Sequence, residues 1–107
     1  MDSTIPAAVD VMGKPYAVCV TQRPDGDYGE CFVNDCRIEV AGFQCEHQQR
    51  DTLLHEVMHA VDHELNCRMS EPQIRRMATG LLQVLRHNSK LVAFIVGDDD
   101  AHPTDQR

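Results

Sequence analysis

The segment covering residues 47–66 most constrains how this chain can fold, because it contains neither glycine nor proline. Apolar residues recur within it at helical spacing: Leu53, Leu54, Val57, Met58, Val61 and Leu65. Residues three and four positions apart lie on one face of an α-helix. We therefore predict a long amphipathic helix here, packed against a core through this apolar stripe.

A second helix is predicted after a short connection. Ser70 is a favourable N-cap residue, and Pro72 lies in the first turn, where its missing N–H group costs no hydrogen bond. Apolar residues then share one face: Ile74, Met77, Ala78, Leu81, Leu82 and Leu85. The pattern fades near His87, and the apolar run at residues 91–96 favours a brief third helix over a strand.

The first half of the chain shows the alternation of short strands. Four segments are expected to be strands, at residues 9–12, 16–21, 28–33 and 36–40. Turns are predicted between them at Gly13, at residues 24–27 and, more weakly, at Asn34-Asp35. The predicted fold is therefore α+β, with a small antiparallel sheet in the N-terminal half packed on two helices.

The length of 107 residues fits one domain, which we place at residues 9–96. Residues 1–8 are expected to be a flexible leader, and residues 97–107, rich in Asp, a disordered acidic tail. Hydrophobic residues make up 42% of the chain, but aromatic residues only 5%, with no Trp. The core is therefore expected to be mainly aliphatic.

The charge and hydropathy of the chain exclude several classes of partner. A formal net charge of −7 argues against nucleic acid and against an anionic membrane surface, since both require clustered Lys and Arg. No run approaches the ~20 apolar residues that span a bilayer. The N-terminus lacks the basic and apolar regions of a signal peptide. We therefore expect a cytoplasmic protein, whose oligomeric state the sequence does not determine.

Five cysteines form an odd set without a CxxC pair: Cys19, Cys31, Cys36, Cys45 and Cys67. A secreted disulfide framework usually has an even count, and the four-residue gap between Cys31 and Cys36 suits a structural zinc site poorly. The cysteines are expected to be reduced and mostly buried thiols.

The pentapeptide His55-Glu56-Val57-Met58-His59 lies within the first predicted helix. Histidines four residues apart share a helix face, so both imidazoles can bind one tetrahedral Zn²⁺. Glu56 is rotated by about 100° from His55, so it can flank the metal without coordinating it. Zinc lowers the pKa of bound water to about 7. Glu56 would then be the general base.

A third metal ligand must come from another element. His63 is excluded, because eight residues of straight helix separate it from His55 by ~12 Å. Glu71 is the best candidate, since it shares a helix face with Ile74 and points towards the first helix. The alternative is that Glu71 only complements the helix dipole. Weaker candidates for the third ligand are Asp62, Glu64 and Glu46.

The remaining histidines, His47, His63 and His87, are expected at the surface or around the metal ligands. One of them, or Tyr28, is a candidate to stabilise the oxyanion of a tetrahedral intermediate. The sequence does not choose among them.

The segment at residues 51–62 resembles the active-site helix of zincin metallopeptidases. Over roughly residues 28–88 the layout is similar to ImmA/IrrE-like proteins and to short HExxH proteins of phages and prophages. The resemblance implies a minimal zincin in which His55, His59 and Glu71 bind zinc and Glu56 is the base. It also implies that residues 36–40 form the edge strand that pairs with an extended peptide.

The leading hypothesis is a zinc-dependent metallopeptidase, encoded by a phage or prophage, that hydrolyses a peptide bond in a protein partner. Zinc-bound hydroxide would attack the carbonyl, with Glu56 carrying the proton. The alternative is a non-catalytic interaction protein stabilised by zinc, because a chain of this length offers little wall for a substrate cleft. A third possibility is a metal-free relative of such enzymes.

Overall fold

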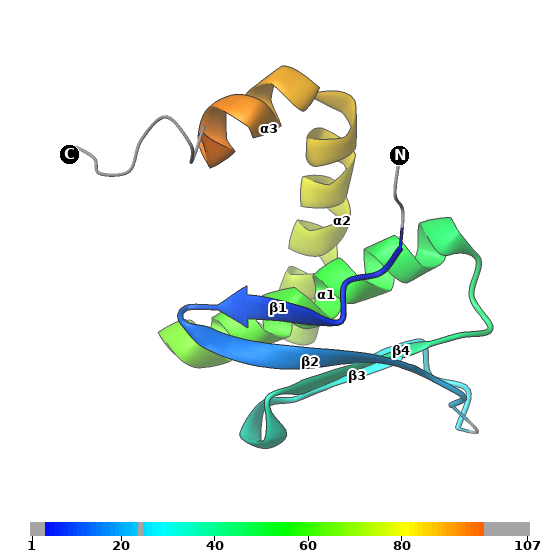
Figure 1. Ribbon diagram of the computed structural model, residues 1–107. Coiled ribbons are helices and arrows are strands. Elements are labelled where there is room, and N and C mark those ends of the chain that lie inside the picture. The colour runs from blue at the N-terminus through cyan, green and yellow to red at the C-terminus, as the bar shows by residue number, and fades with distance from the viewer. Residues whose placement is uncertain (1–3, 24, 98–107) are drawn as a thin grey trace.

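The computed structural model describes residues 4–23 and 25–97 of the chain (Figure 1). Four strands are followed by three helices. In chain order the elements are β1 (Ala8–Val11), β2 (Lys14–Thr21), β3 (Gly29–Phe32), the 3₁₀ turn η1 (Val33–Asp35), β4 (Arg37–Ala41), α1 (Glu46–Leu65), α2 (Glu71–His87) and α3 (Ser89–Val96). The predicted α+β class is confirmed, and so is the third helix.

The four strands form one mixed sheet in the order β1-β2-β4-β3. The β1·β2 and β3·β4 pairs are antiparallel, whereas β2 and β4 are parallel, with Val18 opposite Ile38. The sheet is thus mixed, whereas an antiparallel sheet was predicted. The chain crosses over after β2, so the β3–β4 hairpin returns with β4 alongside β2.

The position of β4 corrects a second expectation. Residues 36–40 were expected to form the edge strand, but β4 lies inside the sheet between β2 and β3. Among the described strands, the edge on that side is β3, which pairs with β4 alone. Any peptide that adds a strand on this side of the sheet therefore has to pair with β3.

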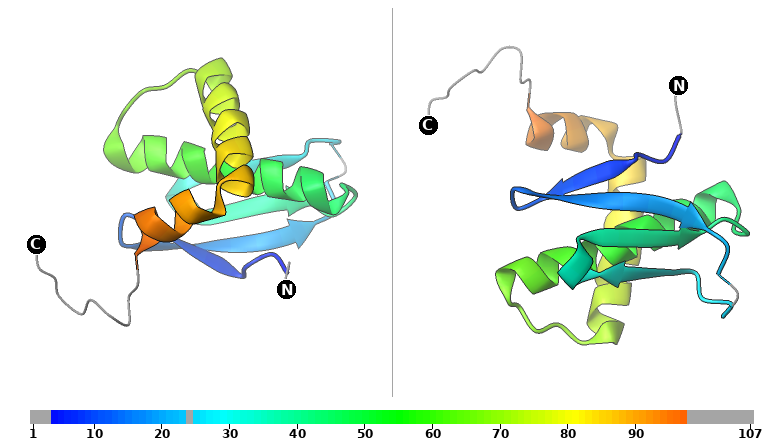
Figure 2. Two further views of the ribbon diagram at one scale, coloured as in Figure 1. Left: turned by 90° about the horizontal axis from the view of Figure 1, so that it is seen from above. Right: turned by 60° about the horizontal axis from the view of Figure 1, so that its bottom comes forward.

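Helix α1 packs its apolar stripe across one face of the sheet (Figure 2). The central buried residues are Val11, Tyr16, Ile38, Val40 and Ala60, with Leu53, Val57 and Val61 packed against them. This core is aliphatic, as predicted, apart from Tyr16. No helix in the described ranges combines the length and apolar character that a bilayer crossing requires.

The ends of the predicted domain fall partly outside the described residues. The predicted leader begins with residues 1–3 and the predicted tail includes residues 98–107, neither of which is described. Strand β1 begins at Ala8, one residue before the predicted boundary, and Ile5 packs against the core.

Tyr16 places a hydroxyl in the apolar core and gives it a partner. The Tyr16 hydroxyl donates to Glu64 Oε2 at 2.9 Å, and Lys14 Nζ lies 3.4 Å from the same oxygen. The hydrogen bond from Tyr16, followed by the one from Lys14, lowers the pKa of Glu64 below its ordinary value. Burial and the contact with Glu64 raise the pKa of Tyr16 well above its ordinary range.

Replacing Tyr16 with Phe is expected to reduce the free energy of unfolding at neutral pH. A group with a lowered folded-state pKa stabilises the fold above its ordinary pKa, 4.5 for Glu64, and loses that contribution as pH falls through the lowered value. The difference between wild type and Tyr16→Phe should therefore shrink in denaturant titrations from neutral pH down to about pH 3. A difference that stays constant across this range would contradict the assignment.

Gly29, the first residue of β3, allows α1 to approach the sheet closely. A Cβ atom at this position would lie 2.6 Å from Thr52 Cγ2, 2.7 Å from the Glu39 carbonyl oxygen and 3.5 Å from Glu56 Cγ. The carbonyl belongs to the neighbouring strand and cannot move away on its own. Only glycine therefore fits between β4 and the part of α1 that carries Glu56.

The Gly29→Ala variant is expected to lose about 1–3 kcal/mol of unfolding free energy, because an added methyl group overpacks this contact. Gly80→Ala is the matched control, since a Cβ at Gly80 in α2 meets nothing within 4 Å. That control should gain about 0.5–1 kcal/mol from helix propensity. Denaturant unfolding of both variants tests the pair, and equal effects of the two substitutions would be inconsistent with the close approach at Gly29.

Candidate metal centre

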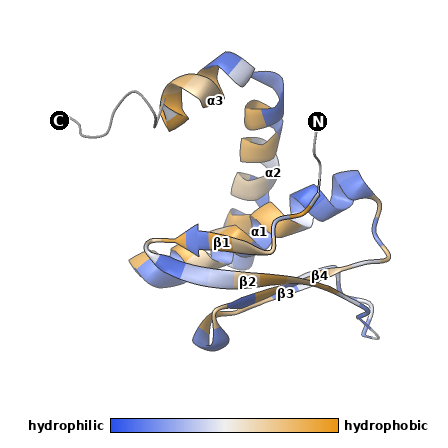
Figure 3. Ribbon diagram, viewed as in Figure 1, coloured by the Kyte–Doolittle hydropathy of each residue, from blue (hydrophilic) through white to orange (hydrophobic). Residues whose placement is uncertain are grey.

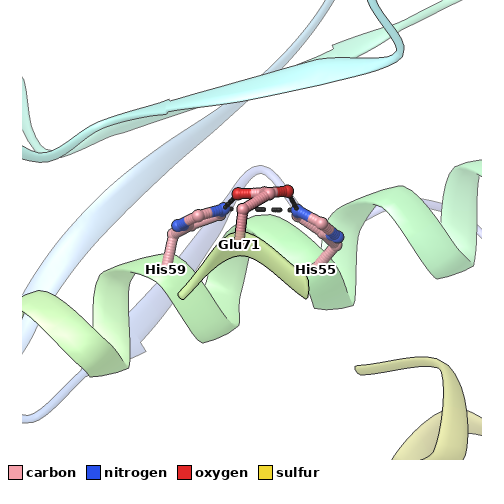
Figure 4. Close-up of side chains that lie close together, drawn as sticks. All are labelled: His55, His59 and Glu71. Carbon is pink, nitrogen blue, oxygen red and sulfur yellow. Dashed lines mark hydrogen bonds and ion pairs between the residues drawn. The ribbon is translucent and has the colours of Figure 1, made fainter. Parts of the chain in front are cut away.

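His55 and His59 lie one turn apart on α1 and turn their rings towards each other (Figure 4). Their Nε2 atoms are 3.2 Å apart, and their ring centroids are separated by 5.0 Å. Both side chains are partly buried, with 18% and 30% exposure. The helical spacing thus brings the two imidazoles to one point, as the motif predicts.

Glu71, the first residue of α2, completes this group from the other side. Its Oε2 lies 2.8 Å from His55 Nε2, and its Oε1 lies 2.9 Å from His59 Nε2. Each of the three residues offers one ligand atom, and these atoms lie within 4.8 Å of one another. The group His55, His59 and Glu71 could therefore hold a metal ion.

The spacing and chemistry of this group fit a tetrahedral zinc ion. Bonds of ~2.0–2.1 Å at tetrahedral angles separate neighbouring ligand atoms by about 3.4 Å. The observed separations of 2.8, 2.9 and 3.2 Å are close to that value. When both Nε2 atoms are deprotonated, the two imidazoles and the carboxylate direct their lone pairs at one point, where a cation can bind. Two nitrogen ligands and one oxygen ligand suit zinc.

The loop between α1 and α2 fixes where Glu71 lies. Helix α1 ends at Leu65, and the next residue, Asn66, adopts the left-handed conformation with φ 55°. Further along the loop, the Met69 N–H donates a hydrogen bond to the Asp62 carboxylate at 2.8 Å. Ser70 and Gln73 then cap α2 reciprocally: Ser70 Oγ accepts from the Gln73 N–H, and Gln73 Oε1 accepts from the Ser70 N–H. These contacts begin α2 at a fixed residue, which turns Glu71 towards α1.

Two buried residues of α2 support the position of Glu71. Ile74 and Ala78 are buried, and they follow Glu71 by three and seven residues, on the same helix face. Arg75 Nη2 lies 3.5 Å from Glu71 Oε2 on the outer side. Glu71 is thus a carboxylate at the end of a packed apolar stripe, as its position in the sequence predicts.

Glu56 is buried beside this group and is not one of its members. It is 7% exposed, and its carboxylate has no hydrogen-bond partner within the described part of the chain. Burial, and then the negative charge of Glu71, raise the pKa of Glu56 to about 7. Glu56 lines the same hollow as the three potential ligands, so its carboxyl group lies close to them.

A cleft of about 470 Å³ opens onto these residues; it is lined by His55, Glu56 and Glu71 from the helices and by Asp27, Tyr28 and Gly29 from the segment that leads into β3. A smaller adjoining hollow of about 270 Å³ reaches His59, Glu30 and Cys31. The edge strand β3 therefore borders the site directly. A larger cavity at Val20, Thr21 and Phe43 contains none of the predicted site residues.

Arg23 forms ion pairs with acidic residues around the connection between β2 and β3, which borders the cleft. Its buried guanidinium lies 2.8 Å from both Glu30 and Glu39 and 3.1 Å from Asp25. Glu30 first, and then Asp25, raise the pKa of Arg23 above its already high ordinary value. A permanent buried cation thus anchors the acidic segment that runs to Tyr28.

The structure places the other sequence-predicted candidates away from the three ligands. Asp62 caps the loop, Glu64 binds Tyr16 and Lys14, and Glu46 pairs with Arg50 at 3.0 Å. His47, His63 and His87 are exposed. Tyr28 borders the cleft, so it stays a candidate to stabilise an oxyanion.

Two residues that line the cleft, Gly29 and Arg75, were not predicted from the sequence. Gly29 gives no sequence signal that α1 lies against it, because that contact is made across the fold. Arg75 did carry a signal, since it lies one helical turn after Glu71, at the spacing of a helical ion pair.

The cysteines are less buried than predicted. All five are free; Cys19, Cys31 and Cys36 are half-buried, while Cys45 and Cys67 are exposed. The last two lie at the start and end of α1, where the chain leaves the core. Burial, and then the charge of Glu56, raise the pKa of Cys31 to about 12. Cys31 is therefore a protonated thiol at neutral pH.

Comparisons with protein families, with curated proteins and with solved structures find no match to this chain.

Proposed function

We propose that this protein is a zinc-dependent metallopeptidase that hydrolyses a peptide bond in a protein partner. The observation that carries the proposal is the pairing of two groups, which line one hollow of about 270 Å³: the three convergent potential ligands and the buried Glu56, which belongs to neither ion pair of that group. A structural metal site needs only the first group. The free carboxylate is the part that a hydrolytic reaction requires.

The residues of the chain have distinct roles in this proposal. His55, His59 and Glu71 would hold the metal. When bound, zinc supplies a Lewis acid that makes a water molecule more acidic and polarises the substrate carbonyl. Glu56 takes the proton from the attacking water and delivers it to the leaving amine, so proton transfer needs no other base. Tyr28, which borders the cleft, would donate to the oxygen of the tetrahedral intermediate.

An extended peptide would bind along β3. This strand has one unpaired edge and borders the cleft, so its backbone groups can hydrogen-bond to a substrate in extended conformation. This replaces the earlier expectation that residues 36–40 bind the substrate.

The proposal is tested by incubating the zinc-loaded protein with a library of unstructured peptides and identifying products by mass spectrometry. Cleavage that disappears with a chelator and returns with zinc supports the assignment. No cleavage of any peptide by fully zinc-loaded protein would count against it. The reaction is proposed for the cytoplasm of a host cell, in keeping with five free thiols and the resemblance to short phage and prophage proteins.

One observation favours the second candidate, a zinc-stabilised interaction protein. The proposed ligands come from two elements, His55 and His59 from α1 and Glu71 from α2. A metal ion at this point would fasten α2 to α1, where only Ile74 and Ala78 of α2 are buried. On this reading zinc raises stability and Glu56→Gln changes no measurable function.

A further inference from the structure

The C-terminal helices form an arm that leaves the body of the protein. We call residues 72–97 the arm and residues 1–71 the body. Figure 1 shows α2 rising from α1, with α3 turning away at its top. Only Ile74 and Ala78 are buried in α2, both in its first half, and α3 has no buried residue.

Hydrophobic residues occur in both helices of the arm (Figure 3), and several of them are exposed. In α3, Phe94 is 85% exposed, Ile95 66% and Val96 65%, and Leu91 is exposed as well. In α2, Met77, Leu81 and Val84 are exposed and follow one another at helical spacing. A helix as apolar as α3 is normally buried. Contiguous apolar patches of several hundred Å² usually mark an interaction site.

The arm and the body also carry opposite charges. The arm contains four basic residues, Arg75, Arg76, Arg86 and Lys90, and no Asp or Glu, so its formal charge is +4. The body contains five basic and 13 acidic residues, which gives −8. One copy of the chain therefore presents both a basic apolar surface and an acidic surface.

We propose that the arm is a dimerisation element whose partner is a second copy of this chain. In a two-fold arrangement the apolar faces of two arms cover each other, and the basic residues of each arm lie near the acidic body of the other copy. Covering the exposed apolar side chains would bury roughly 600 Å² per copy, at the exposed fractions observed and about 150 Å² for each fully exposed large side chain. That approaches the ~800 Å² per partner of a standard interface.

Other occupants fit the arm less well. Residues 98–107 contain four Asp residues and offer only Ala101 and Pro103 as apolar side chains, so they match its charge but cannot cover its apolar face. An anionic membrane would attract the arm but repel a body of charge −8. A second copy offers both an apolar surface, on its arm, and acidic residues, on its body.

Sedimentation of the full chain between about 1 and about 200 μM tests the proposal, because a dimer forms by mass action. The wild-type protein is expected to be dimeric at the upper end, and Phe94→Asp is expected to weaken dimerisation by at least about 30-fold, as for an interface hot spot. Met12→Asp is the matched control: Met12 is exposed at the β1–β2 turn of the body, with φ 53°, which Asp tolerates. Circular dichroism confirms that both variants fold.

Several outcomes would overturn the proposal. These are a wild-type monomer at all concentrations, dimerisation of Phe94→Asp at wild-type strength, or equal weakening by Met12→Asp. If removal of residues 98–107 converts a monomer into a dimer, the tail covers the arm instead. Binding of a monomer to vesicles of anionic phospholipid would assign the arm to membranes. Sedimentation equilibrium reports the mass of the species in solution, so this readout requires neither metal binding nor hydrolysis.

Discussion

The Glu56→Gln variant is expected to bind zinc as the wild-type protein does and to hydrolyse peptides about 10²–10⁴-fold more slowly. Gln has nearly the size and shape of Glu, so it fills the same buried position against Gly29. It cannot accept the proton of the attacking water. The ligands of the candidate metal centre are untouched, because Glu56 is not a member of that group.

Two measurements on the same samples check this result: elemental analysis for zinc and the initial rate on one cleaved peptide. Glu46→Gln is the matched control, since Glu46 lies on the same helix, is exposed and, among the described residues, pairs with Arg50 alone. It should keep both zinc and activity. Wild-type turnover by Glu56→Gln would remove Glu56 as the general base, and loss of zinc would mean that it serves the metal site instead.

The His59→Ala variant is expected to lose more than about 100-fold in zinc affinity, since even the loss of a residue that only orients a ligand costs about 10–100-fold. Two of the three potential ligands would remain, His55 on α1 and Glu71 on α2. His63→Ala is the matched control. His63 lies one turn further along α1 and is exposed, and it is not part of the ligand group.

Competition with a coloured zinc chelator gives both affinities, and thermal unfolding gives an independent readout. A ligand that binds only the folded state raises stability in proportion to the logarithm of its concentration over its Kd. Zinc should therefore raise the unfolding temperature of wild type and of His63→Ala, and not that of His59→Ala. Equal affinities of the two variants would contradict the proposed ligand set.

The helices could be predicted well from the sequence, because their signals are local. The glycine-free and proline-free segment with apolar residues at helical spacing gave α1, and the Ser70 cap with Pro72 in the first turn gave the start of α2. The same local reasoning brought His55 and His59 together. It also favoured Glu71 as the third ligand, because this carboxylate lies at the end of the apolar face of α2, although complementing the helix dipole stayed an alternative.

The sheet was predicted less well, because strand pairing is not a local property. Alternation at residues 16–21 and 36–40 shows that both segments are strands, but nothing in either segment says that they pair in parallel. The identity of the edge strand depends on that pairing. The wall of the cleft beside the metal centre could therefore not be predicted, and neither could the close contact of Gly29 with α1.

One geometric claim is central: the first turn of α2 brings a carboxylate to two imidazoles of α1, and these three side chains bind one metal ion. The most direct test is a crystal structure of the zinc-loaded protein. We predict one ion bound by Nε2 of His55, Nε2 of His59 and the Glu71 carboxylate at about 2.0–2.1 Å, with the fourth position open to solvent. An ion bound elsewhere, or no ion in the presence of excess zinc, would contradict the account.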